Sequence, residues 1–308
     1  KNLALSIIDE QHRFGVHQRL ALTSKGNMVD TLVMTATPIP RTLMLTAYGD
    51  MDTSRLIEKP SGRKPVDTRV ISLERLEQVV ESVGRALSSG NKVFWVCPLV
   101  EESEKLDVAA AQDRHAHLQH RFPNQVGLIH GRMKGPEKDT VMNEFINGPI
   151  KILVATTVIE VGVDVPAATV MVIEHAERFG LAQLHQLRGR IGRNDKSSTC
   201  LLIYNAPLTE MAQKRLSVMR ETDDGFVIAE KDLKLRGAGE LLGTRQSGLP
   251  EFRIADLQVH SDLLSIARDD ALLMLDNDPE LTSERGQAVR TLLYLFEQDA
   301  AVGNLRSG

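Results

Sequence analysis

Two adjacent carboxylates near the start of the chain are the first residues that could do chemistry. Asp9 and Glu10 follow an apolar stretch at residues 3–8, which reads as a buried strand, in the segment "IIDEQHRF". Adjacent carboxylates repel each other and are costly to bury, so we expect a cation beside them. Such a pair can hold Mg²⁺ and polarise the water that attacks a nucleotide γ-phosphate. The alternative interpretation is a solvated strand end.

Two further segments follow apolar strands and carry small or hydroxyl residues. The segment "TATPIPRT" at 35–42 could hydrogen-bond the acidic pair, although a proline-rich turn explains it equally well. In "ATTVIEVGVDVP" at 155–166, Gly162 allows close backbone approach and Asp164 could bind a ribose hydroxyl. An ordinary strand and turn remains the alternative for the second segment.

The arginine-rich segment "QLHQLRGRIGR" at 183–193 is the most specific pattern in the sequence. It reads Q-x-x-G-R-x-G-R, with Gln186 followed by Arg190 and Arg193. Two arginines three residues apart share one face if the segment is helical. Guanidinium groups suit developing phosphoryl charge, which is the role of an arginine finger.

The elements that must position these residues alternate between strands and helices. Apolar runs predict strands at 3–8, 31–36, 68–72, 92–97, 126–130, 151–156, 170–174 and 199–204. Helical patterns occupy 74–87, about 107–121 and 136–147, and after residue 207 the patterns are helical only. Several strands are apolar at consecutive positions, which favours parallel sheets covered on both faces. The sequence therefore predicts an α/β fold followed by an all-helical region.

Composition restricts the class of protein and its partners. Of the 308 residues, 42% are apolar and 25% are charged, which is typical of a globular protein, and the net charge is -4. Nucleic acid would therefore have to bind at local basic patches. Cys97 and Cys200 lie far apart in apolar runs, which suits a reducing compartment, and no run is long enough to span a membrane. Because the chain opens inside a predicted strand, we expect a fragment.

Taken in order, these segments resemble the later motifs of superfamily 2 helicases. "DEQHRFGVHQRL" and "GFVIAEKDLKLRGAGELLGTRQSG" resemble the RecG family of bacterial ATP-dependent branched-DNA helicases more closely. The resemblance covers essentially the whole chain. It implies RecA-like domains: part of a first one at 1–62, a complete second one at 63–206, and a translocation motif with C-terminal helices at 207–308.

The resemblance also implies roles for individual residues. For catalysis it implies Mg²⁺ bound by Asp9 through water, Glu10 as general base, and Gln186, Arg190 and Arg193 facing the γ-phosphate. The ATP-binding residues would be Gln11, His12, Gly162 and Asp164. The residues that couple hydrolysis to movement would be Thr35, Thr37, Arg215, Arg236 and Gln246. The DNA-binding residues would be His130, Gly131, Arg132 and Thr156.

The implied cofactors are ATP and Mg²⁺, and the implied partners are branched double-stranded DNA and a single-stranded-DNA-binding protein. The implied location is the bacterial cytoplasm, with the nucleoid. The phosphate-binding string G-x-x-x-x-G-K-[S/T] does not occur in this sequence, so we expect the chain alone to be inactive. Two alternatives stay open: a translocase like the transcription-repair coupling factor, and a non-catalytic module that binds DNA or a partner.

Overall fold

The computed structural model describes residues 3–9, 25–26, 29–35, 54–58, 62–98, 104–156, 165–236, 254–255 and 260–296. The chain divides into two compact units: Ser54–Asp232, and Lys1–Thr53 together with Leu233–Gly308. Each unit is described by itself. The predicted division at residues 62 and 206 stays a prediction.

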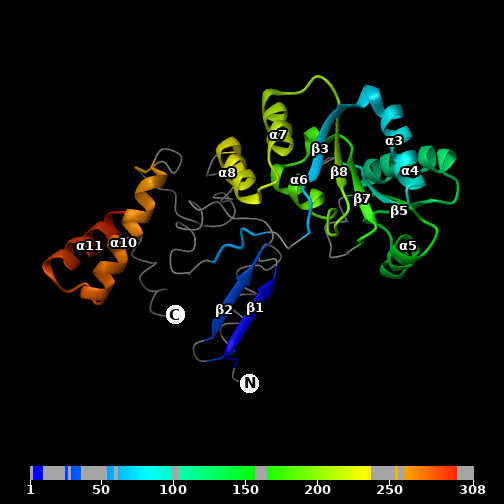
Figure 1. Ribbon diagram of the computed structural model, residues 1–308. Helices are drawn as coiled ribbons and strands as arrows, with labels where there is room; N and C mark the ends of the chain where they lie inside the picture. The colour runs from blue at the N-terminus through cyan, green and yellow to red at the C-terminus, as the bar shows by residue number, and fades with distance from the viewer. Residues whose placement is uncertain are drawn as a thin grey trace. The chain divides into compact units, whose positions relative to one another are not determined.

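The larger unit contains a six-stranded sheet whose strands all run parallel (Figure 1). In spatial order the strands are β3 (Val66–Ser72), β8 (Ser198–Tyr204), β7 (Ala168–Ile173), β4 (Lys92–Val96), β6 (Ile152–Ala155) and β5 (Val126–Ile129). Every residue of β6 is fully buried, as expected for a central parallel strand that is covered on both faces. The predicted parallel α/β fold is confirmed.

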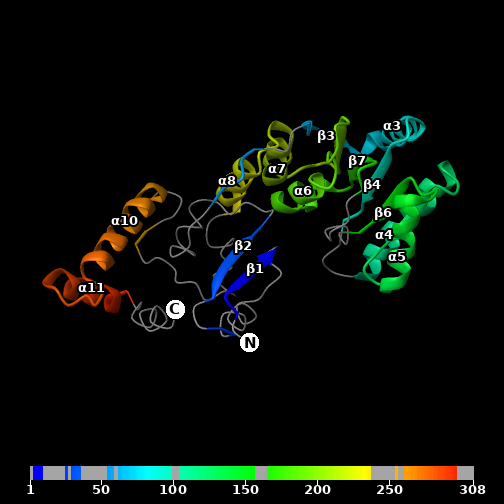
Figure 2. The same cartoon turned by 60° about the horizontal axis from the view of Figure 1, so that its bottom comes forward.

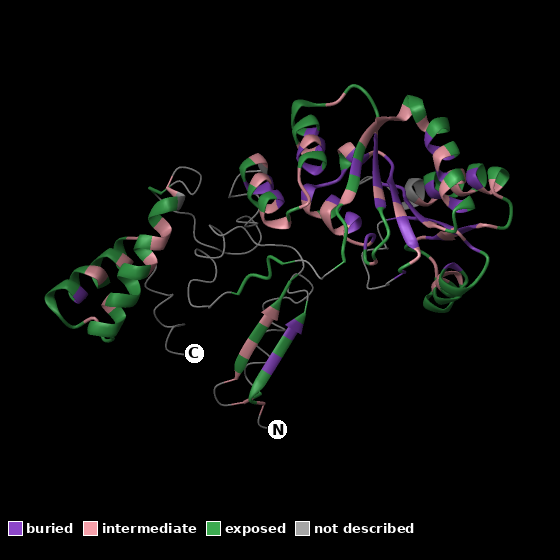
Figure 3. Ribbon diagram, viewed as in Figure 1, coloured by how far each residue is buried: buried purple, intermediate pink, exposed green. Residues whose placement is uncertain are grey.

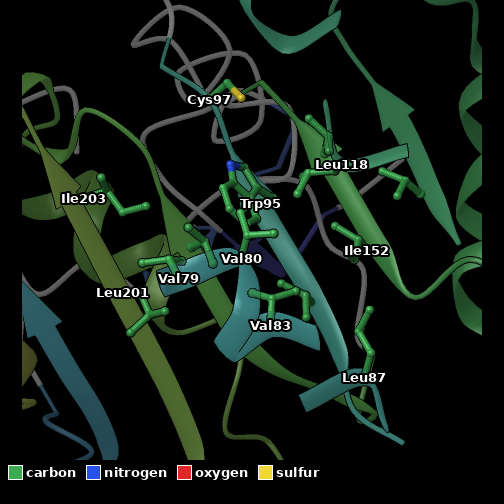
Figure 4. Packing of buried hydrophobic residues seen from close by; sticks show 14 of the residues in the cluster. Val79, Val80, Val83, Leu87, Trp95, Cys97, Leu118, Ile152, Leu201 and Ile203 are labelled. Carbon is green, nitrogen blue, oxygen red and sulfur yellow. The ribbon is translucent and has the colours of Figure 1, made fainter. Parts of the chain in front are cut away.

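One face of this sheet is covered by α3 (Leu76–Ser88) and α4 (Glu104–Arg121). In α3 the apolar residues Val79, Val80, Val83 and Leu87 recur every three or four positions and therefore share a helix face. They pack with Trp95 and other sheet residues in one buried cluster (Figure 4). A short 3₁₀ turn, η2 (Leu73–Arg75), leads into α3.

The opposite face is covered by α5 (Gly135–Asn147) and by α6 (Leu181–Arg188) with α7 (Glu210–Glu221). Strand residues alternate between the two faces, so Phe94 points away from Trp95. The ring of Phe94 lies 5.1 Å from that of Phe145 in α5. Buried Thr68 of β3 lies on this same face. It accepts a hydrogen bond from Arg188 of α6, which also donates to the carbonyl of Met219 in α7. Figure 2 shows the same elements from a second direction.

The smaller unit contains a two-stranded parallel sheet and a pair of helices. Strand β1 (Leu5–Asp9) pairs with β2 (Asp30–Met34), with Asp9 opposite Met34. The helices are α10 (Ser261–Asn277) and α11 (Glu284–Leu295), and most of their residues are exposed (Figure 3). Helix α8 (Gly225–Arg236) begins in the larger unit, and its residues 233–236 belong to the smaller one.

Candidate functional site

The carboxyl edge of the six-stranded sheet gathers several of the predicted site residues. Because the strands are parallel, the segments that follow β5 and β6 leave the sheet at the same edge. His130, Gly131 and Arg132 follow β5, and Thr156 follows β6. The Thr156 backbone N–H donates to the carbonyl of Ile129 at 3.3 Å, so the two segments lie side by side. Ligand sites of open parallel sheets form at this edge.

Two polar atoms at this edge have no hydrogen-bond partner among the described residues. They are the hydroxyl of Thr156, a residue only 1% exposed, and Nδ1 of His130. Buried polar groups are nearly always paired, so an unpaired one needs an explanation such as a bound water or ligand. Gly131 and Arg132 are exposed next to them. The edge can therefore form hydrogen bonds with a ligand through Thr156 and His130, and Arg132 can supply positive charge to it.

The arginine-rich segment lies partly on α6 and partly beyond it. Leu181, Leu184 and Leu187 are fully buried and fix the helix on the sheet. The helix ends at Arg188, so Arg190 and Arg193 do not share a helix face, as a helical segment would have placed them. The chain turns at Gly192, whose φ of 69° favours glycine. Arg193 is exposed, and Gln186 and Arg190 are partly buried.

Arg188 is a buried arginine that sequence reasoning did not single out. Its Nη1 donates to the carbonyls of Met219 at 2.8 Å and Thr222 at 3.0 Å, at the C-terminal end of α7. Its Nη2 donates to Nδ1 of His185 at 3.2 Å. Burial lowers the pKa of the guanidinium. Arg188 therefore supplies donors to carbonyls that a helix end leaves without partners.

Arg215 on α7 makes the reciprocal connection. Its guanidinium donates to the carbonyl of Glu177 at 2.8 Å and to that of Phe179 at 3.0 Å. These carbonyls belong to η4 (Ala176–Arg178) and to the residue after it, just before α6 begins. We call Arg188 and Arg215 the arginine pair. The pair fastens both ends of the α6 segment to α7.

A buried charged network at the end of β7 was also missed. The carboxylate of Glu174 accepts hydrogen bonds from the indole N–H of Trp95 and from the guanidinium of Arg114. The Arg114 guanidinium lies 5.7 Å from the centre of the Trp95 ring. Burial, with the nearby Glu174 carboxylate, raises the pKa of the Cys97 thiol. The network joins β4, α4 and β7 where the chain turns toward α6.

In the smaller unit, Asp9 ends β1 and Thr35 follows β2 directly. Since the two strands are parallel and Asp9 pairs with Met34, both residues lie at the same edge of the small sheet. Asp9 is exposed, and its carboxylate oxygens are donors of the kind that Mg²⁺ prefers. The role of Asp9 as a Mg²⁺ ligand stays a prediction.

The remaining predicted residues lie outside what the structure describes. They are Glu10, Gln11, His12, Thr37, Gly162, Asp164 and Gln246. Arg236 is the last residue of α8, and its side chain is likewise outside the description. Within the described ranges, no three His, Cys, Asp or Glu side chains cluster as metal ligands. None of the described helices combines the length and hydropathy that crossing a bilayer requires.

Two family models match separate parts of the chain. "Helicase conserved C-terminal domain" matches residues 73–195, which include strands β4, β5, β6 and β7 of the sheet and the arginine-rich segment. "ATP-dependent DNA helicase RecG, domain 3, C-terminal" matches residues 222–294, from the end of α7 to α11. The two matches fall within the predicted second RecA-like domain and within the predicted C-terminal helical region, respectively.

Curated relatives and solved structures agree with these matches. ATP-dependent DNA helicase RecG of Acidithiobacillus ferridurans is 54% identical over 279 residues, which are 90% of this chain and 41% of that protein. The RecG of Escherichia coli K12 is 57% identical over 261 residues, 83% of this chain and 38% of that protein. The chain thus spans about two fifths of the length of these relatives.

Among solved structures, RecG bound to a three-way DNA junction superposes with a TM-score of 0.66 at 48% identity. The superposition covers 86% of this chain and 34% of the RecG chain. The DUF1998 helicase MrfA, bound to DNA and AMPPNP, superposes with a TM-score of 0.50 at 17% identity. That superposition covers 82% of this chain and 41% of the MrfA chain. The second likeness concerns the fold alone. The sequence matches, the helical appendage and the structural likeness agree, and the chain belongs to the RecG family of helicases.

Proposed function

We propose that this chain is the part of an ATP-dependent helicase that acts on branched double-stranded DNA. The observation that carries the proposal is the arginine pair. Arg188 and Arg215 fasten the segment with Arg190 and Arg193 to α7, which leads into the region matched by the RecG-specific model. An arginine segment suited to a nucleotide is thereby linked to a helical region suited to moving DNA.

On the nucleotide side, the proposed roles follow the chemistry of the residues. Asp9 would hold Mg²⁺ through water, and Glu10 would activate the attacking water. Gln186, Arg190 and Arg193 would stabilise the charge on the γ-phosphate. Gln11, His12, Gly162 and Asp164 would contact the rest of ATP. Bound Mg²⁺ would neutralise phosphate charge during transfer.

On the DNA side, the unpaired atoms of Thr156 and His130 support a binding role for the edge that they share with Gly131 and Arg132. Backbone phosphates are the expected contacts, because hydroxyl, imidazole and guanidinium donors suit them. Thr35, Thr37, Arg215, Arg236 and Gln246 would couple hydrolysis to movement. A single-stranded-DNA-binding protein as partner, and a cytoplasmic location with the nucleoid, belong to the same proposal.

The proposal also keeps three parts for the chain. Residues 1–62 would belong to a first motor domain, 63–206 would form the second, and 207–308 would form the translocation region. The RecG-specific match at 222–294 supports this family over the transcription-repair coupling factor.

Arg215 offers a direct test in the parent helicase, the longer protein that also supplies the phosphate-binding loop. Replacing it with alanine removes both hydrogen bonds to the segment before α6. We expect ATP hydrolysis to persist while unwinding of a three-way DNA junction falls by about tenfold, the scale of a lost coupling between sites. Arg215→Lys should behave like the alanine variant, because an ammonium lacks the planar fork that reaches two carbonyls.

Lys214→Ala is the matched control, because Lys214 is an exposed residue of α7 whose ion pair with Glu210 lies on the same helix and at the surface. Melting temperature is measured on every variant. If ATP hydrolysis, unwinding and melting temperature all decline in proportion, Arg215 is merely structural and the coupling role is wrong.

A further inference from the structure

A groove on the α3 face of the six-stranded sheet is separate from the candidate site. It has a volume of 540 Å³ and is lined by α3, η2 and the strands β3, β8 and β7. The apolar residues of its lining, which we call the floor, are Ile71, Val79, Val83, Ala86, Val170 and Leu201. Ile71, Ala86 and Val170 are partly exposed, and the other three are buried. Three of these, Val79, Val83 and Leu201, are seen together in Figure 4. The volume lies in the range of pockets that bind ligands.

The groove runs along the α3 face of the sheet, from Val170 and Thr199 to Ile71 and Arg75 at the carboxyl end of β3. Val170 is the third residue of β7, and Thr199 is the second of β8. Val170 precedes the end of β7 by three residues, which corresponds to about 10 Å at the rise of a strand. None of the predicted nucleotide and DNA residues is among the described residues that line the groove.

Three arginines line the groove, against one acid, Glu81. Arg69 forms an ion pair with Asp67 at 2.7 Å, and both side chains are more than half exposed, so the pair is weak. Arg75 donates to Gln78 at 2.8 Å and Arg85 donates to Ser82 at 2.7 Å, and both acceptors are neutral. Within the described part of the chain, no acid is paired with Arg75 or Arg85. The groove is thus locally cationic in a chain whose net charge is -4.

Arg75 lies just before α3 and Arg85 lies in its last turn. Ten residues of helix separate them, a distance of about 15 Å. An extended peptide covers that distance with four or five residues. Its acids would reach the two arginines, and an apolar side chain between them would reach the floor. DNA fits less well, because a phosphate backbone carries nothing to cover an apolar floor.

We propose that this groove binds an extended segment of a partner protein with two acidic residues four or five positions apart and an apolar residue between them. The two arginines form charge-assisted hydrogen bonds with the acids, and the floor buries the apolar side chain. The groove shares no residue with the proposed ATP or DNA site. This inference therefore stands or falls separately from the proposed function.

The test is a selection of random decapeptides displayed on phage against the immobilised 308-residue chain, with circular dichroism confirming that each variant folds. We expect the recovered peptides to share the acidic–apolar–acidic spacing. A recovered peptide, measured by fluorescence anisotropy, should bind Arg75→Ala/Arg85→Ala at least about tenfold more weakly, as expected for lost charge-assisted hydrogen bonds. Arg121→Ala, which changes an exposed arginine on α4 outside the groove, should bind like the original chain.

A charge reversal provides the second arm. Selection on Arg75→Glu/Arg85→Glu should recover peptides with lysine or arginine in place of the two acids. Recovery of peptides without acidic enrichment, or of peptides that bind both alanine and original chains equally, overturns the proposal. A duplex DNA oligonucleotide that binds the original chain, displaces the peptide and loses affinity with the same alanine substitutions would make the groove a nucleic-acid surface and also overturn it.

Discussion

Arg193 is exposed just past a turn at Gly192, while the leucines of α6 before it are buried. Its guanidinium Nε donates to the carbonyl of Gly189 at 3.4 Å, a long and therefore weak hydrogen bond. The side chain is thus exposed on a backbone that the buried leucines fix. This combination suits a residue that reaches toward a phosphate when a nucleotide is bound.

In the parent helicase, Arg193→Ala should lower the rate of ATP hydrolysis by about 10³, the scale of a removed arginine finger. Nucleotide affinity should change much less, because the finger acts on charge that develops in the transition state. Steady-state hydrolysis and nucleotide titration on the same variant separate the two quantities. Equal losses in both would instead indicate a contact with the bound ground state.

The Glu174 network shows how a single buried acid is tolerated. Glu174 is 6% exposed, and its carboxylate accepts hydrogen bonds from both Trp95 and Arg114. A buried charge without such partners would be strongly unfavourable. Glu174 lies immediately before His175, where the chain turns toward η4 and α6 with a φ of 48°. The acid therefore fixes the point from which the arginine-rich segment departs.

At the scale of elements, the main feature is the attachment of α6 to α7. Arg188 supplies donors to the end of α7, and Arg215 supplies donors to the segment before α6. Each arginine donates to two carbonyls. Its planar guanidinium fixes the positions of both, whereas a lysine ammonium on its flexible stem would fix them less well. Four hydrogen bonds from two guanidinium groups therefore hold α6 and the turn before it against α7.

Arg188→Met should reduce the free energy of unfolding by about 2–4 kcal/mol. Methionine keeps much of the aliphatic volume but leaves the carbonyls of Met219 and Thr222 without this donor, and each unsatisfied group costs about 1–3 kcal/mol. Urea unfolding measures the loss. Arg220→Met, at an exposed position on α7, is the control and should change the free energy by less than about 0.5 kcal/mol. A loss at Arg188 no larger than at Arg220 would contradict the bridging role.

The turn between α10 and α11 depends on one carboxylate. Asp278 accepts hydrogen bonds from the Ser283 hydroxyl, from the backbone N–H groups of Thr282 and Ser283, and from the Thr282 hydroxyl. These bonds, with the Ser283 hydroxyl first, lower the pKa of Asp278 from 3.8 to about 2. The charged form is the one that holds the turn.

Since the folded-state pKa is lowered, this stabilisation is complete above about pH 4 and is lost as the pH falls toward about 2. Protection of the α10–α11 backbone amides against hydrogen exchange should therefore fall on acidification from pH 5 to pH 2. The protection factors are corrected for the pH dependence of exchange in an unfolded chain. Asp278→Asn should remove that pH dependence, because the amide has no comparable ionisation. An unchanged pH profile in the asparagine variant would show that another group is responsible.

At the scale of the whole molecule, we expect the 308-residue chain by itself to hydrolyse no appreciable ATP. Phosphoryl transfer depends on positioning and charge stabilisation, and the sequence contains no loop of the G-x-x-x-x-G-K-[S/T] type to hold the phosphates. Phosphate release by the purified chain, with and without a three-way DNA junction, measures this. DNA-stimulated turnover would refute the prediction.

The larger unit is where sequence and structure agree best. Apolar runs such as "KILVAT" and "KVFWVC" predicted buried parallel strands, and β6 and β4 lie there. Helix periodicity predicted α3 within two residues at each end. These features depend on residues close together in the sequence, where the period of apolar side chains is visible directly. Of the predicted DNA-binding residues, those after β5 and Thr156 after β6 lie side by side, because parallel strands end at the same edge.

Tertiary structure alone decided the pairing of the buried charges and the end of α6. Arg188 lies 120 residues from Thr68 and 31 from Met219, and Glu174 lies 60 residues from Arg114. No local pattern encodes such contacts, because they form only when packed elements bring distant side chains into a space without water. The helix ends at Arg188 with Gly189 as its C-cap, and the chain then turns at Gly192, so Arg190 and Arg193 lie beyond the helix. The sequence by itself determined the strands, the motifs and their order, and the folded chain determined which arginines hold the molecule together and which remain exposed to a ligand.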